Sequence, residues 1–409
     1  MRILWLKTEL LHPIDKGGKI RTYNMLKELK REHHVIYLTL DDEVQNTEAR
    51  SLAFEYCHEL ITVPHRQNKK FTAGFYRDLA LNLFSPMPYA IKKYESAAMQ
   101  EKIREQLGRK AFDVLICDFL APAVNLPGYL PCPTVLFQHN VEAMIWKRHY
   151  EVQTNPTRKA YLHGQWTKMR KFEQQMCGRF DTVVAVSRED KDQMKDEYGV
   201  ARIYDVPTGV DTAYFRPSGR ESLSPHSVVF TGSMDWLPNE DAIRYFVEQV
   251  MPLVKQSIPD FSLVVVGRDP SSAVVELAQR DRSVVVTGRV EDVRPYIERA
   301  AAYIVPLRIG GGTRLKIYEA MAMEKAVIST TIGAEGLALR DGTELLLADT
   351  AESFAQTVVR VLSDETLATS LGQQAASKVR ESFGWPRAAK YFADFCKQAV
   401  NGAQARSLS

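Results

Sequence analysis

The feature that most constrains the fold is a regular alternation of short, β-branched apolar runs with longer stretches of helical periodicity. Runs such as Leu263–Gly267 suit strands that are buried on both faces, as the strands of parallel sheets are. Strands that alternate with helices along a chain form parallel sheets covered by helices. The sequence therefore predicts an α/β fold with doubly wound, Rossmann-like sheets.

The predicted strands divide into two sets. The first half contains Arg2–Lys7, His34–Leu40, Leu60–Pro64, Asp113–Cys117, Thr134–Gln138, Thr182–Val186 and Arg202–Val206. The second half contains Val228–Thr231, Phe261–Val266, Val284–Thr287, Tyr303–Pro306, Ala326–Ser329 and Glu344–Leu347. Helical stretches in the first half include Gly18–Arg31, Ile91–Leu107, Arg158–Cys177 and Arg188–Tyr198.

A break between the two sets predicts a domain boundary. The chain has 409 residues, which suits two or three domains. The stretch Arg216–His226 is rich in Ser, Pro and charge, so we interpret it as part of a linker. We predict two facing domains, residues 1–208 and 209–383, with a central cleft, and a final segment 384–409 that crosses back to the first domain. Ligands of such sheets bind beyond the carboxyl ends of the strands.

Composition excludes several classes of protein. With 45% hydrophobic residues the chain can build large cores, which excludes wholesale disorder. No apolar stretch reaches the roughly 18 residues of a membrane helix, and the apolar run within Met1–Lys7 is too short for a signal peptide. The five cysteines never form a CxxC pair, so we expect no disulfide framework or zinc site. We therefore expect a cytoplasmic protein.

The charge distribution points to an anionic partner of the first half. The net charge of +3 is too small to indicate nucleic-acid binding. Residues 1–200 nevertheless hold 30 Lys/Arg against 25 Asp/Glu, whereas residues 201–409 hold 23 against 25. We expect the first half to meet the anionic group.

The segment Gly310–Ala322 is the strongest candidate for chemistry. Three glycines, Gly310 to Gly312, follow a predicted strand and open a helix, where the backbone can approach a ligand and unpaired N–H groups favour an anion. Arg314 and Lys316 lie in the first turn, where cations are normally disfavoured unless an anion is bound. A flexible loop with a surface Lys316–Glu319 pair is the alternative.

Two features of the first half are weaker candidates. Gly17 and Gly18 precede a predicted helix and could bind a phosphate through their amides, or they form an ordinary helix start. His139 follows the strand ending at Gln138 and could donate a hydrogen bond to a sugar hydroxyl or stabilise charge. A structural histidine is the alternative.

Two further patterns remain open. Asp190-Lys191-Asp192 mimics a DxD metal site, but acidic residues in a first helical turn also suit the helix dipole. Arg66–Lys110 holds ten Lys/Arg against four Asp/Glu, interleaved with aromatic residues. This pattern suits an anionic membrane surface or a lipid-phosphate acceptor, and a solvated helix face with core aromatics is the alternative.

Taken together, these residues resemble the retaining glycosyltransferases of family 4, which have the GT-B fold of two facing Rossmann-like domains. The likeness extends to Asp205–Pro217 as an interdomain connector, Phe230–Met234 as a strand end, Val285–Val290 as a nucleotide-base loop and Glu319–Ala322 as the EAMA helix. Trp385 precedes the helix that crosses back in such folds.

The resemblance implies roles for individual residues. Glu319 would hold the ribose, Gly18 would donate an amide to the pyrophosphate, and His139 would lie beside the transferred sugar. The remaining implied donor-binding positions are Gly17, Gly232, Arg289, Val290, Gly311, Gly312, Thr313 and Leu315, and the implied acceptor-binding positions are Asn140 and Glu142. Gly311 stands where the family has the first glutamate of its E-x7-E pair, and the usual Arg…Lys phosphate pair is missing from Ser233–Asn239. We expect Arg314 and Lys316 to supply that charge.

The implied activity is a retaining, metal-independent transfer of a sugar from a UDP- or GDP-sugar to a hydroxyl of a sugar or lipid-linked acceptor. No cofactor and no nucleic acid are implied, and bacterial surface-polysaccharide or glycolipid assembly at the inner face of the membrane is the expected setting. A nucleotide-sugar 2-epimerase and a catalytically inactive sugar-nucleotide-binding module are the alternatives.

Overall fold

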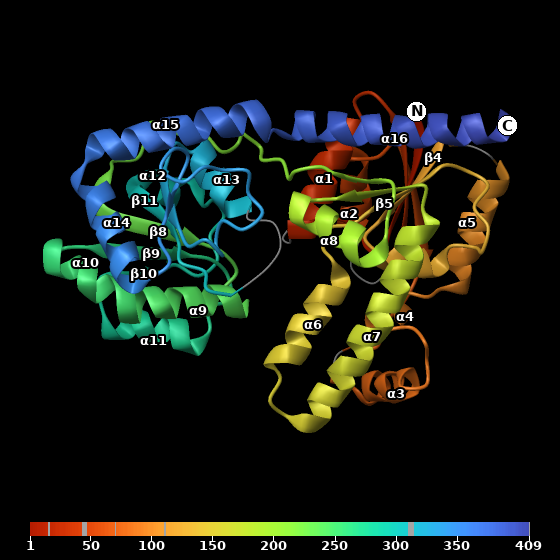
Figure 1. Ribbon diagram of the computed structural model, residues 1–409, viewed down its shortest axis with the longest axis horizontal. Helices are drawn as coiled ribbons and strands as arrows, with labels where there is room; N and C mark the ends of the chain where they lie inside the picture. The colour runs from red at the N-terminus through yellow and green to blue at the C-terminus, as the bar shows by residue number, and fades with distance from the viewer. Residues whose placement is uncertain (15–16, 43–46, 70, 110–111, 310–314, 409) are drawn as a thin grey trace. The chain divides into compact units, whose positions relative to one another are not determined.

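The protein forms two compact units in a computed structural model that describes residues 1–14, 17–42, 47–69, 71–109, 112–309 and 315–408 (Figure 1). Unit 1 comprises Met1–Thr208 together with Trp385–Ser409, and unit 2 comprises Gly209–Gly384. Each unit is built on one parallel sheet, as the alternation of strands and helices predicts.

The sheet of unit 1 has seven strands in the order β3-β2-β1-β4-β5-β6-β7. The strands are β1 (Arg2–Lys7), β2 (His34–Asp41), β3 (Glu59–Pro64), β4 (Val114–Asp118), β5 (Thr134–Phe137), β6 (Thr182–Ala185) and β7 (Ile203–Asp205). Every neighbouring pair is parallel. All five residues of β4 are buried, which is why the strand is a continuous apolar run until its last residue.

Helices cover both faces of this sheet. The helices of unit 1 are α1 (Gly17–Leu29), α2 (Thr47–Leu52), α3 (Ala73–Asn82), α4 (Tyr89–Lys92), α5 (Ala97–Arg109), α6 (Glu142–Val152), α7 (Pro156–Arg179), α8 (Arg188–Tyr198) and α16 (Trp385–Leu408), with 3₁₀ turns η1 (Ala53–Glu55) and η2 (Ala121–Asn125). In Figure 1 the helices α6 and α7 pair and extend away from the sheet of unit 1.

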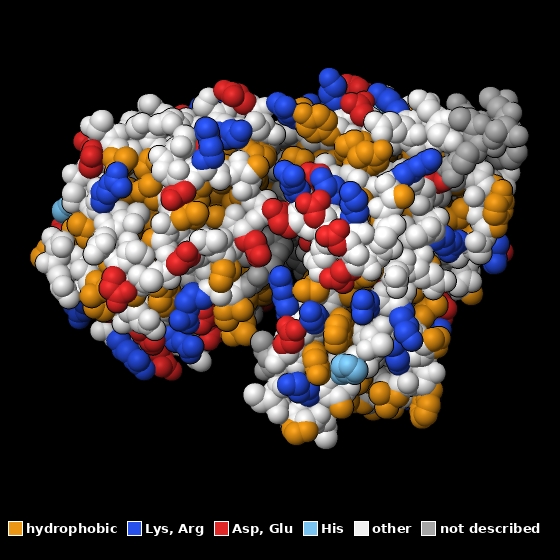
Figure 2. All heavy atoms as spheres, in the orientation of Figure 1, with side chains coloured by type: hydrophobic (Ala, Val, Ile, Leu, Met, Phe, Trp, Pro, Cys, Tyr) orange, Lys and Arg blue, Asp and Glu red, His pale blue; other side chains and the backbone are white. Residues whose placement is uncertain are grey.

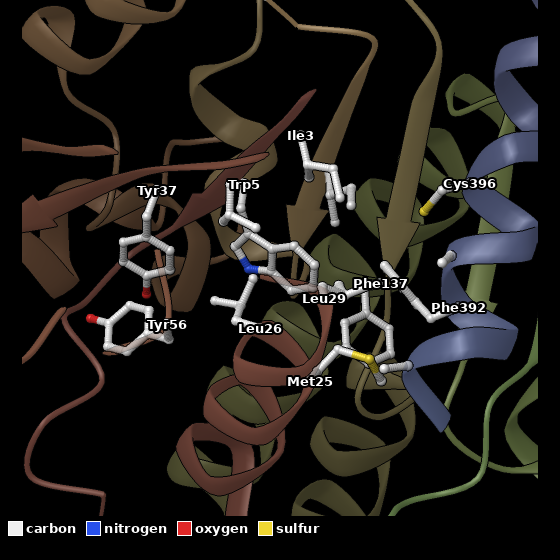
Figure 3. Packing of buried hydrophobic residues seen from close by; sticks show 14 of the residues in the cluster. Ile3, Trp5, Met25, Leu26, Leu29, Tyr37, Tyr56, Phe137, Phe392 and Cys396 are labelled. Atoms are coloured by element: carbon white, nitrogen blue, oxygen red, sulfur yellow. The ribbon is translucent and has the colours of Figure 1, made fainter. Parts of the chain in front are cut away.

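The last helix belongs to the core of unit 1. Trp385, Phe392 and Cys396 of α16 are buried in the same cluster as Trp5 of β1 (Figure 3). The ring centroids of Trp5 and Phe392 are 5.6 Å apart, and those of Phe137 and Phe392 are 4.8 Å apart. Buried aromatic rings of this size contribute strongly to stability, so α16 is an integral element of unit 1.

The sheet of unit 2 has six strands in the order β10-β9-β8-β11-β12-β13. The strands are β8 (Ser224–Thr231), β9 (Ser262–Val266), β10 (Val284–Val286), β11 (Ala300–Val305), β12 (Ala326–Ser329) and β13 (Leu346–Leu347). The helices are α9 (Leu237–Tyr245), α10 (Met251–Ser257), α11 (Ser272–Arg280), α12 (Arg294–Arg299), α13 (Leu315–Ala322), α14 (Ala351–Ser363) and α15 (Glu365–Ser382), and a π-helical turn η3 (Phe246–Val250) joins α9 to α10.

Two predicted boundaries are wrong. The predicted helix Ile91–Leu107 is interrupted between α4 and α5, and the predicted linker Arg216–His226 ends earlier, because β8 already begins at Ser224. The interruption has a physical cause. The Asn125 side chain accepts a hydrogen bond from the backbone N–H of Ser96 (2.8 Å) and donates one to the carbonyl of Tyr94 (2.9 Å), so these backbone groups are satisfied outside a helix.

The predicted helix Arg188–Tyr198 is confirmed and shows how its sequence sets both ends. The Ser187 hydroxyl accepts a hydrogen bond from the N–H of Asp190 at 3.1 Å, which caps the first turn. Gly199 ends the helix in the left-handed region with φ of 67°. Asp190-Lys191-Asp192 thus lies on the helix, and Lys191 pairs with Asp205 at 2.5 Å.

Candidate functional site

Each sheet has one point at which the strand order reverses, and several of the candidate residues lie there. In unit 1 the reversal lies between β1 and β4, and in unit 2 it lies between β8 and β11. Loops beyond the carboxyl ends of such strands bind ligands in open α/β sheets. We call these two regions the unit 1 edge and the unit 2 edge.

The unit 1 edge is organised around the carboxylate of Asp118, the last residue of β4. Asp118 is completely buried. Its Oδ2 accepts hydrogen bonds from Trp5 Nε1 (3.0 Å), Lys7 Nζ (2.8 Å) and Thr22 Oγ1 (2.7 Å). Its Oδ1 lies 2.7 Å from Nε2 of His139, which follows β5. One side chain therefore ties together β1, α1, β4 and the loop after β5.

The charges of this cluster are strongly coupled. Burial alone would raise the pKa of Asp118, but the attraction of Lys7 and His139 and their hydrogen bonds outweigh it and hold the pKa below its usual range. Burial lowers the pKa of His139 to about 3 despite the opposing effect of Asp118. At neutral pH, Asp118 is therefore ionised and paired with Lys7, and His139 is a neutral imidazole that offers hydrogen bonds rather than positive charge.

Phe119 connects His139 to the start of α1. Its ring stacks on His139 with a centroid distance of 3.8 Å, and Lys7 Nζ lies 4.1 Å from the Phe119 ring centroid. The residue has φ of 68°, which is an uncommon and costly backbone conformation for a phenylalanine. A Cβ on Gly18 would lie 2.7 Å from Phe119 Cζ, so glycine is needed at position 18 for the ring to fit.

The start of α1 has the features of an anion site. Gly17 is exposed and begins the helix, and its first turn contains no acidic residue. Lys19 and Arg21 are both buried within the first turn and a half. Burial lowers the pKa of Arg21 to about 9, although Asp190 and Asp118 oppose this. Positive side chains beside the positive end of a helix favour a bound anion.

The loop after β5 is held by a residue that the sequence pattern did not reveal. Glu173 of α7 is completely buried and accepts hydrogen bonds from the backbone N–H groups of Glu142 (2.8 Å) and Ala143 (2.9 Å). It also accepts from Gln138 Nε2 (2.9 Å) and Tyr198 Oη (2.8 Å). Glu173 thereby caps α6, whose own N-cap residue Val141 has no capping side chain.

The predicted acceptor residues lie on this loop. Asn140 and Glu142 are both partly buried, next to the fully enclosed His139. Desolvation raises the pKa of Glu142 to about 7, and burial also raises the pKa of Glu173 to about 7, partly through Glu142. A carboxyl group with such a pKa can exchange protons near neutral pH.

The unit 2 edge brings two backbones into very close approach. A Cβ on Gly267, after β9, would lie 1.6 Å from the carbonyl oxygen of Gly232, after β8. A Cβ on Gly232 would lie 2.7 Å from Asn239 Nδ2 and 2.9 Å from Lys316 Nζ. Position 267 therefore has no room for a side chain, and the Gly232 backbone lies close to the amine of Lys316.

Lys316 lies in the first turn of α13, and its amine points back over β8. It donates a hydrogen bond to Asn239 Oδ1 at 2.9 Å and lies 4.1 Å from the centroid of the buried Phe230 ring. Asn239 in turn donates to the carbonyl of Ser233 at 2.8 Å. The structure thus places the predicted lysine and Gly232 together at the strand-order reversal.

Glu319 lies one turn beyond Lys316 on α13. Its side chain is partly buried, and desolvation raises its pKa to about 7, with Lys316 opposing the shift. Leu315, at the start of α13, is also partly buried. Lys316 and Glu319 are therefore both partly buried at the start of one helix rather than fully exposed.

Two arginines of the unit 2 edge were not predicted. Arg308 follows β11 and makes a two-point contact with Asp241 of α9, at 2.6 and 3.1 Å, which anchors the chain just before the glycine run. Arg268 follows β9 and donates from Nε to the Ser233 hydroxyl at 3.0 Å. Neither lies in a recognisable motif, and only their positions directly after predicted strands could have indicated them.

The other predicted donor residues are less closely grouped in the structure. Arg289 is exposed and Val290 is partly buried against the core of unit 2, both after β10 at the end of the sheet. Gly311, Gly312, Thr313 and Arg314 lie outside the described residues.

Among the described residues no group of three or more His, Cys, Asp or Glu side chains is placed to hold a metal ion. In the same part of the chain, no helix is long and apolar enough to cross a membrane.

Comparison with known proteins assigns both units to one kind of enzyme. The model of "Glycosyltransferase Family 4" matches residues 16–214, and that of "Glycosyl transferases group 1" matches residues 225–364. An uncharacterized protein in the cps region of Klebsiella pneumoniae is 19% identical over 391 residues, 93% of this chain and 96% of that protein.

A curated enzyme has a higher sequence identity over a shorter region. The D-inositol 3-phosphate glycosyltransferase of Streptomyces bingchenggensis is 27% identical over 257 residues, which are 56% of this chain and 55% of that enzyme. The chain thus matches about half the length of this relative.

Solved structures share the fold at low sequence identity. Sucrose-phosphate synthase from Thermosynechococcus elongatus has a TM-score of 0.70 at 16% identity, covering 98% of this chain and 99% of that one. Anabaena HepE in complex with UDP and glucose has a TM-score of 0.66 at 13% identity, covering 96% and 98%. The fold is therefore GT-B, and the two family matches show that this chain is a glycosyltransferase of family 4.

Proposed function

We propose that this glycosyltransferase transfers a sugar from a UDP- or GDP-sugar to a hydroxyl acceptor, with retention of the anomeric configuration and without a metal ion. The observation that carries the proposal is the unit 2 edge, where the Lys316 amine lies against the Gly232 backbone at the start of α13. HepE, which shares the fold, was solved with UDP and glucose, which supports a nucleotide-sugar donor.

In this proposal the donor diphosphate binds at the start of α13. Lys316 and Arg314 supply positive charge, and backbone N–H groups of Gly311, Gly312, Thr313 and Leu315 supply hydrogen bonds. Glu319, one turn further, holds the ribose hydroxyls, and Arg289 and Val290 border the base. Gly311 replaces the first glutamate of the family's E-x7-E pair and has no side chain, so in this proposal other groups hold the sugar.

The unit 1 edge contributes the remaining contacts of the proposed reaction. Gly17 and Gly18 offer amides to the diphosphate at the positive end of α1, and His139 contacts the transferred sugar. Asn140 and Glu142 are assigned to the acceptor. Because His139 is neutral at physiological pH, its proposed contribution is a hydrogen bond to a hydroxyl group.

The proposed chemical step needs no protein nucleophile. The bond between the anomeric carbon and the β-phosphate oxygen breaks, and the acceptor oxygen bonds to the same face of that carbon. The acceptor proton passes to the departing phosphate. Negative charge grows on the diphosphate during this step, so the fixed amides and cations lower the barrier.

The proposed setting is surface-polysaccharide or glycolipid assembly at the cytoplasmic face of a membrane, with a sugar or lipid-linked acceptor. The relative encoded in the cps region of Klebsiella pneumoniae supports a role in polysaccharide synthesis. The family match favours the transferase over the 2-epimerase and the inactive binding module.

The test is a transfer assay with a panel of UDP-, GDP- and ADP-sugars and an acceptor extract, with products analysed by NMR. We expect one donor to be consumed only with acceptor present, and the product linkage to keep the donor's anomeric configuration. Activity should persist in EDTA. Inversion of configuration, loss of activity in EDTA, or epimerisation without acceptor would each contradict the corresponding part of the proposal.

A further inference from the structure

Unit 1 carries an exposed apolar patch that has no role in the proposed function. Of the fifteen large apolar side chains that are exposed among the described residues, five lie between Phe71 and Phe84. They are Phe71 (80% exposed), Tyr76 (56%), Leu81 (65%), Leu83 (57%) and Phe84 (91%). We call these five residues the α3 patch. In Figure 2 apolar side chains gather over α3, at the lower right of the view.

The exposed positions on α3 form one face of the helix. Tyr76 and Ala80 are four residues apart on α3 and Leu81 lies beside them, so these exposed side chains share one side of the helix, and Leu83 and Phe84 are exposed in the turn that follows it. The inward side carries Phe75, which contacts Tyr89 with ring centroids 5.8 Å apart. A surface helix of a globular protein normally turns its polar face outward, and α3 presents apolar residues on both sides.

The sequence alone left two interpretations of the aromatic residues in this region, and their exposure now separates them. Phe75, Tyr89 and Tyr94 are partly buried against the protein. Phe71 and Phe84, in contrast, expose most of their side chains to solvent. Exposed apolar clusters on a folded surface mark contacts with another apolar body.

The charge around the α3 patch is positive. Between Arg66 and Tyr94 the sequence carries six Lys/Arg and a single acidic residue, Asp78. The side chain of Asp78 already accepts from Asn68 at 2.7 Å and lies 3.6 Å from Arg77. Arg66, Lys69 and Arg77 are all exposed. Cations that surround exposed aromatic and leucine side chains match an anionic, apolar interface.

The patch is held rigidly enough to present these groups. Thr72 caps α3 by accepting from the N–H of Phe75 at 3.3 Å. Lys168 of α7 donates to the carbonyl of Asn82 at 2.7 Å and to that of Leu83 at 3.2 Å. The Asn82 amide donates to the carbonyl of Met87 at 3.0 Å and its oxygen accepts from Gln165 at 2.9 Å.

We propose that the α3 patch is a membrane anchor that inserts its apolar side chains into a bilayer carrying anionic phospholipid headgroups. The apolar residues lie on the exposed side of α3, directly before it at Phe71, and in the turn after it. Phe71 and Phe84 enter the acyl boundary, while Arg66, Lys69 and Arg77 contact the phosphate groups. The anchor extends the proposed function by bringing the enzyme to a lipid-linked acceptor, but the binding itself does not depend on that function.

The test is co-sedimentation of the full-length protein with vesicles of phosphatidylcholine mixed with phosphatidylglycerol, compared with phosphatidylcholine alone. We expect binding to the anionic vesicles that weakens in high salt. Phe71→Ser with Phe84→Ser should weaken binding at least tenfold, because two apolar insertions are lost. Arg66→Glu with Lys69→Glu should weaken it at least twentyfold, at about fivefold for each cation removed.

A matched control uses two exposed apolar residues outside the patch. Phe54→Ser with Leu223→Ser removes side chains that are 53% and 51% exposed and should leave vesicle binding unchanged. Both sets of substitutions lie on the surface, so the variants should fold. Equal binding to both kinds of vesicle, no binding of the wild type, or binding that survives Phe71→Ser with Phe84→Ser would overturn the anchor and leave the patch as a protein-binding surface.

Donor binding measured without vesicles separates this inference from the proposed function. The α3 variants should bind nucleoside diphosphate like the wild type. A protein that binds vesicles through the patch but binds no nucleotide would refute the proposed function and leave the anchor intact.

Discussion

The buried carboxylate of Asp118 determines which ring nitrogen of His139 carries the proton. Its carboxylate lies 2.7 Å from Nε2 of His139, and two lone pairs cannot approach so closely without repulsion. The proton of the neutral imidazole therefore belongs on Nε2, and Nδ1 is left as a hydrogen-bond acceptor. Among the described residues neither ring nitrogen makes an aligned hydrogen bond, but Nε2 faces the Asp118 carboxylate, so Nδ1 is the atom of His139 that a ligand hydroxyl can satisfy once it reaches the site.

The first prediction concerns this tautomer. Asp118→Asn places an amide donor opposite Nε2, so the proton should move to Nδ1 and sugar transfer should fall at least tenfold. Ring nitrogen shifts of His139 in ¹⁵N-histidine-labelled protein measure the change. Thr22→Val removes another partner of Asp118 and should leave the tautomer as in the wild type. An unchanged tautomer in Asp118→Asn would contradict the positioning role.

Loss of the Asp118 charge also leaves Lys7 buried without its counter-ion, which costs about 3–5 kcal/mol. Asp118→Asn combined with Lys7→Met should recover part of that stability without restoring the tautomer. The pair of variants therefore separates the structural role of the carboxylate from its effect on His139.

Lys316 carries the second prediction at this scale. Lys316→Met keeps the packing of the stem on Phe230 and removes the amine, so it should weaken nucleoside-diphosphate binding by about 1.5–3 kcal/mol, as for a lost charge-assisted hydrogen bond. Isothermal titration calorimetry measures the affinity. Lys255→Met is the control, because Lys255 pairs with Asp281 on another side of unit 2. Unchanged affinity in Lys316→Met would exclude the phosphate role.

The sequence could predict some residues of the site and not others. Lys316, Glu319 and Gly232 stand in a recognisable segment or directly after a strand. Asp118 pairs with Lys7 across 111 positions, which only the pairing of β4 with β1 brings together. In the sequence, the only indication of a role for Asp118 is that this charged residue ends an entirely apolar run.

At the scale of elements, the helix α6 depends on a residue of its neighbour. No residue before α6 can cap it, and Glu173 of α7 accepts from its first N–H groups instead. The strands were predictable because parallel strands buried on both faces are continuous apolar runs. The start of α6 could not be predicted in the same way, because the residue that caps it, Glu173, is 30 positions away in the sequence.

The third prediction tests this cap. Glu173→Gln replaces one of the two carboxylate oxygens with an NH₂ group, which cannot accept a hydrogen bond. One backbone N–H at the start of α6 then loses its acceptor, so the free energy of unfolding should fall by about 1–3 kcal/mol. Because the same loop carries His139 and Asn140, transfer activity should fall as well. Urea unfolding and the transfer assay measure both. Glu151→Gln, on the exposed end of α6, should change neither, and a Glu173→Gln variant with wild-type stability would refute the capping role.

For the whole molecule, the buried charges of unit 1 make its stability depend on pH. The His139 pKa is lowered to about 3, whereas a histidine in an unfolded chain has a pKa of about 6.5. Between these values the unfolded chain binds the additional proton, so the contribution of His139 to stability falls as the pH decreases from about 6.5 toward 3. The lowered pKa of Asp118 acts in the same direction below about 3.8. The raised pKa values of Glu142 and Glu173, about 7 in the folded protein, act in the opposite direction as the pH falls below about 7.

The fourth prediction follows from this linkage. Urea unfolding at about pH 7.5 and about pH 5 should show that acid destabilises the wild type relative to His139→Gln, because only the wild type has a histidine at position 139 that takes up a proton on unfolding. Other buried histidines add to the effect in both proteins, so the difference between them isolates His139. The same pH dependence in both would contradict a neutral, buried His139 in the folded state.

The proposed reaction requires the unit 2 edge to bind a nucleoside diphosphate through its phosphates. Titration calorimetry of the full-length protein with UDP, GDP and ADP, and with the matching nucleosides, tests it most directly. At least one diphosphate should bind at least tenfold more tightly than its nucleoside. No binding of any diphosphate, or equal binding of nucleoside and diphosphate, would contradict the claim.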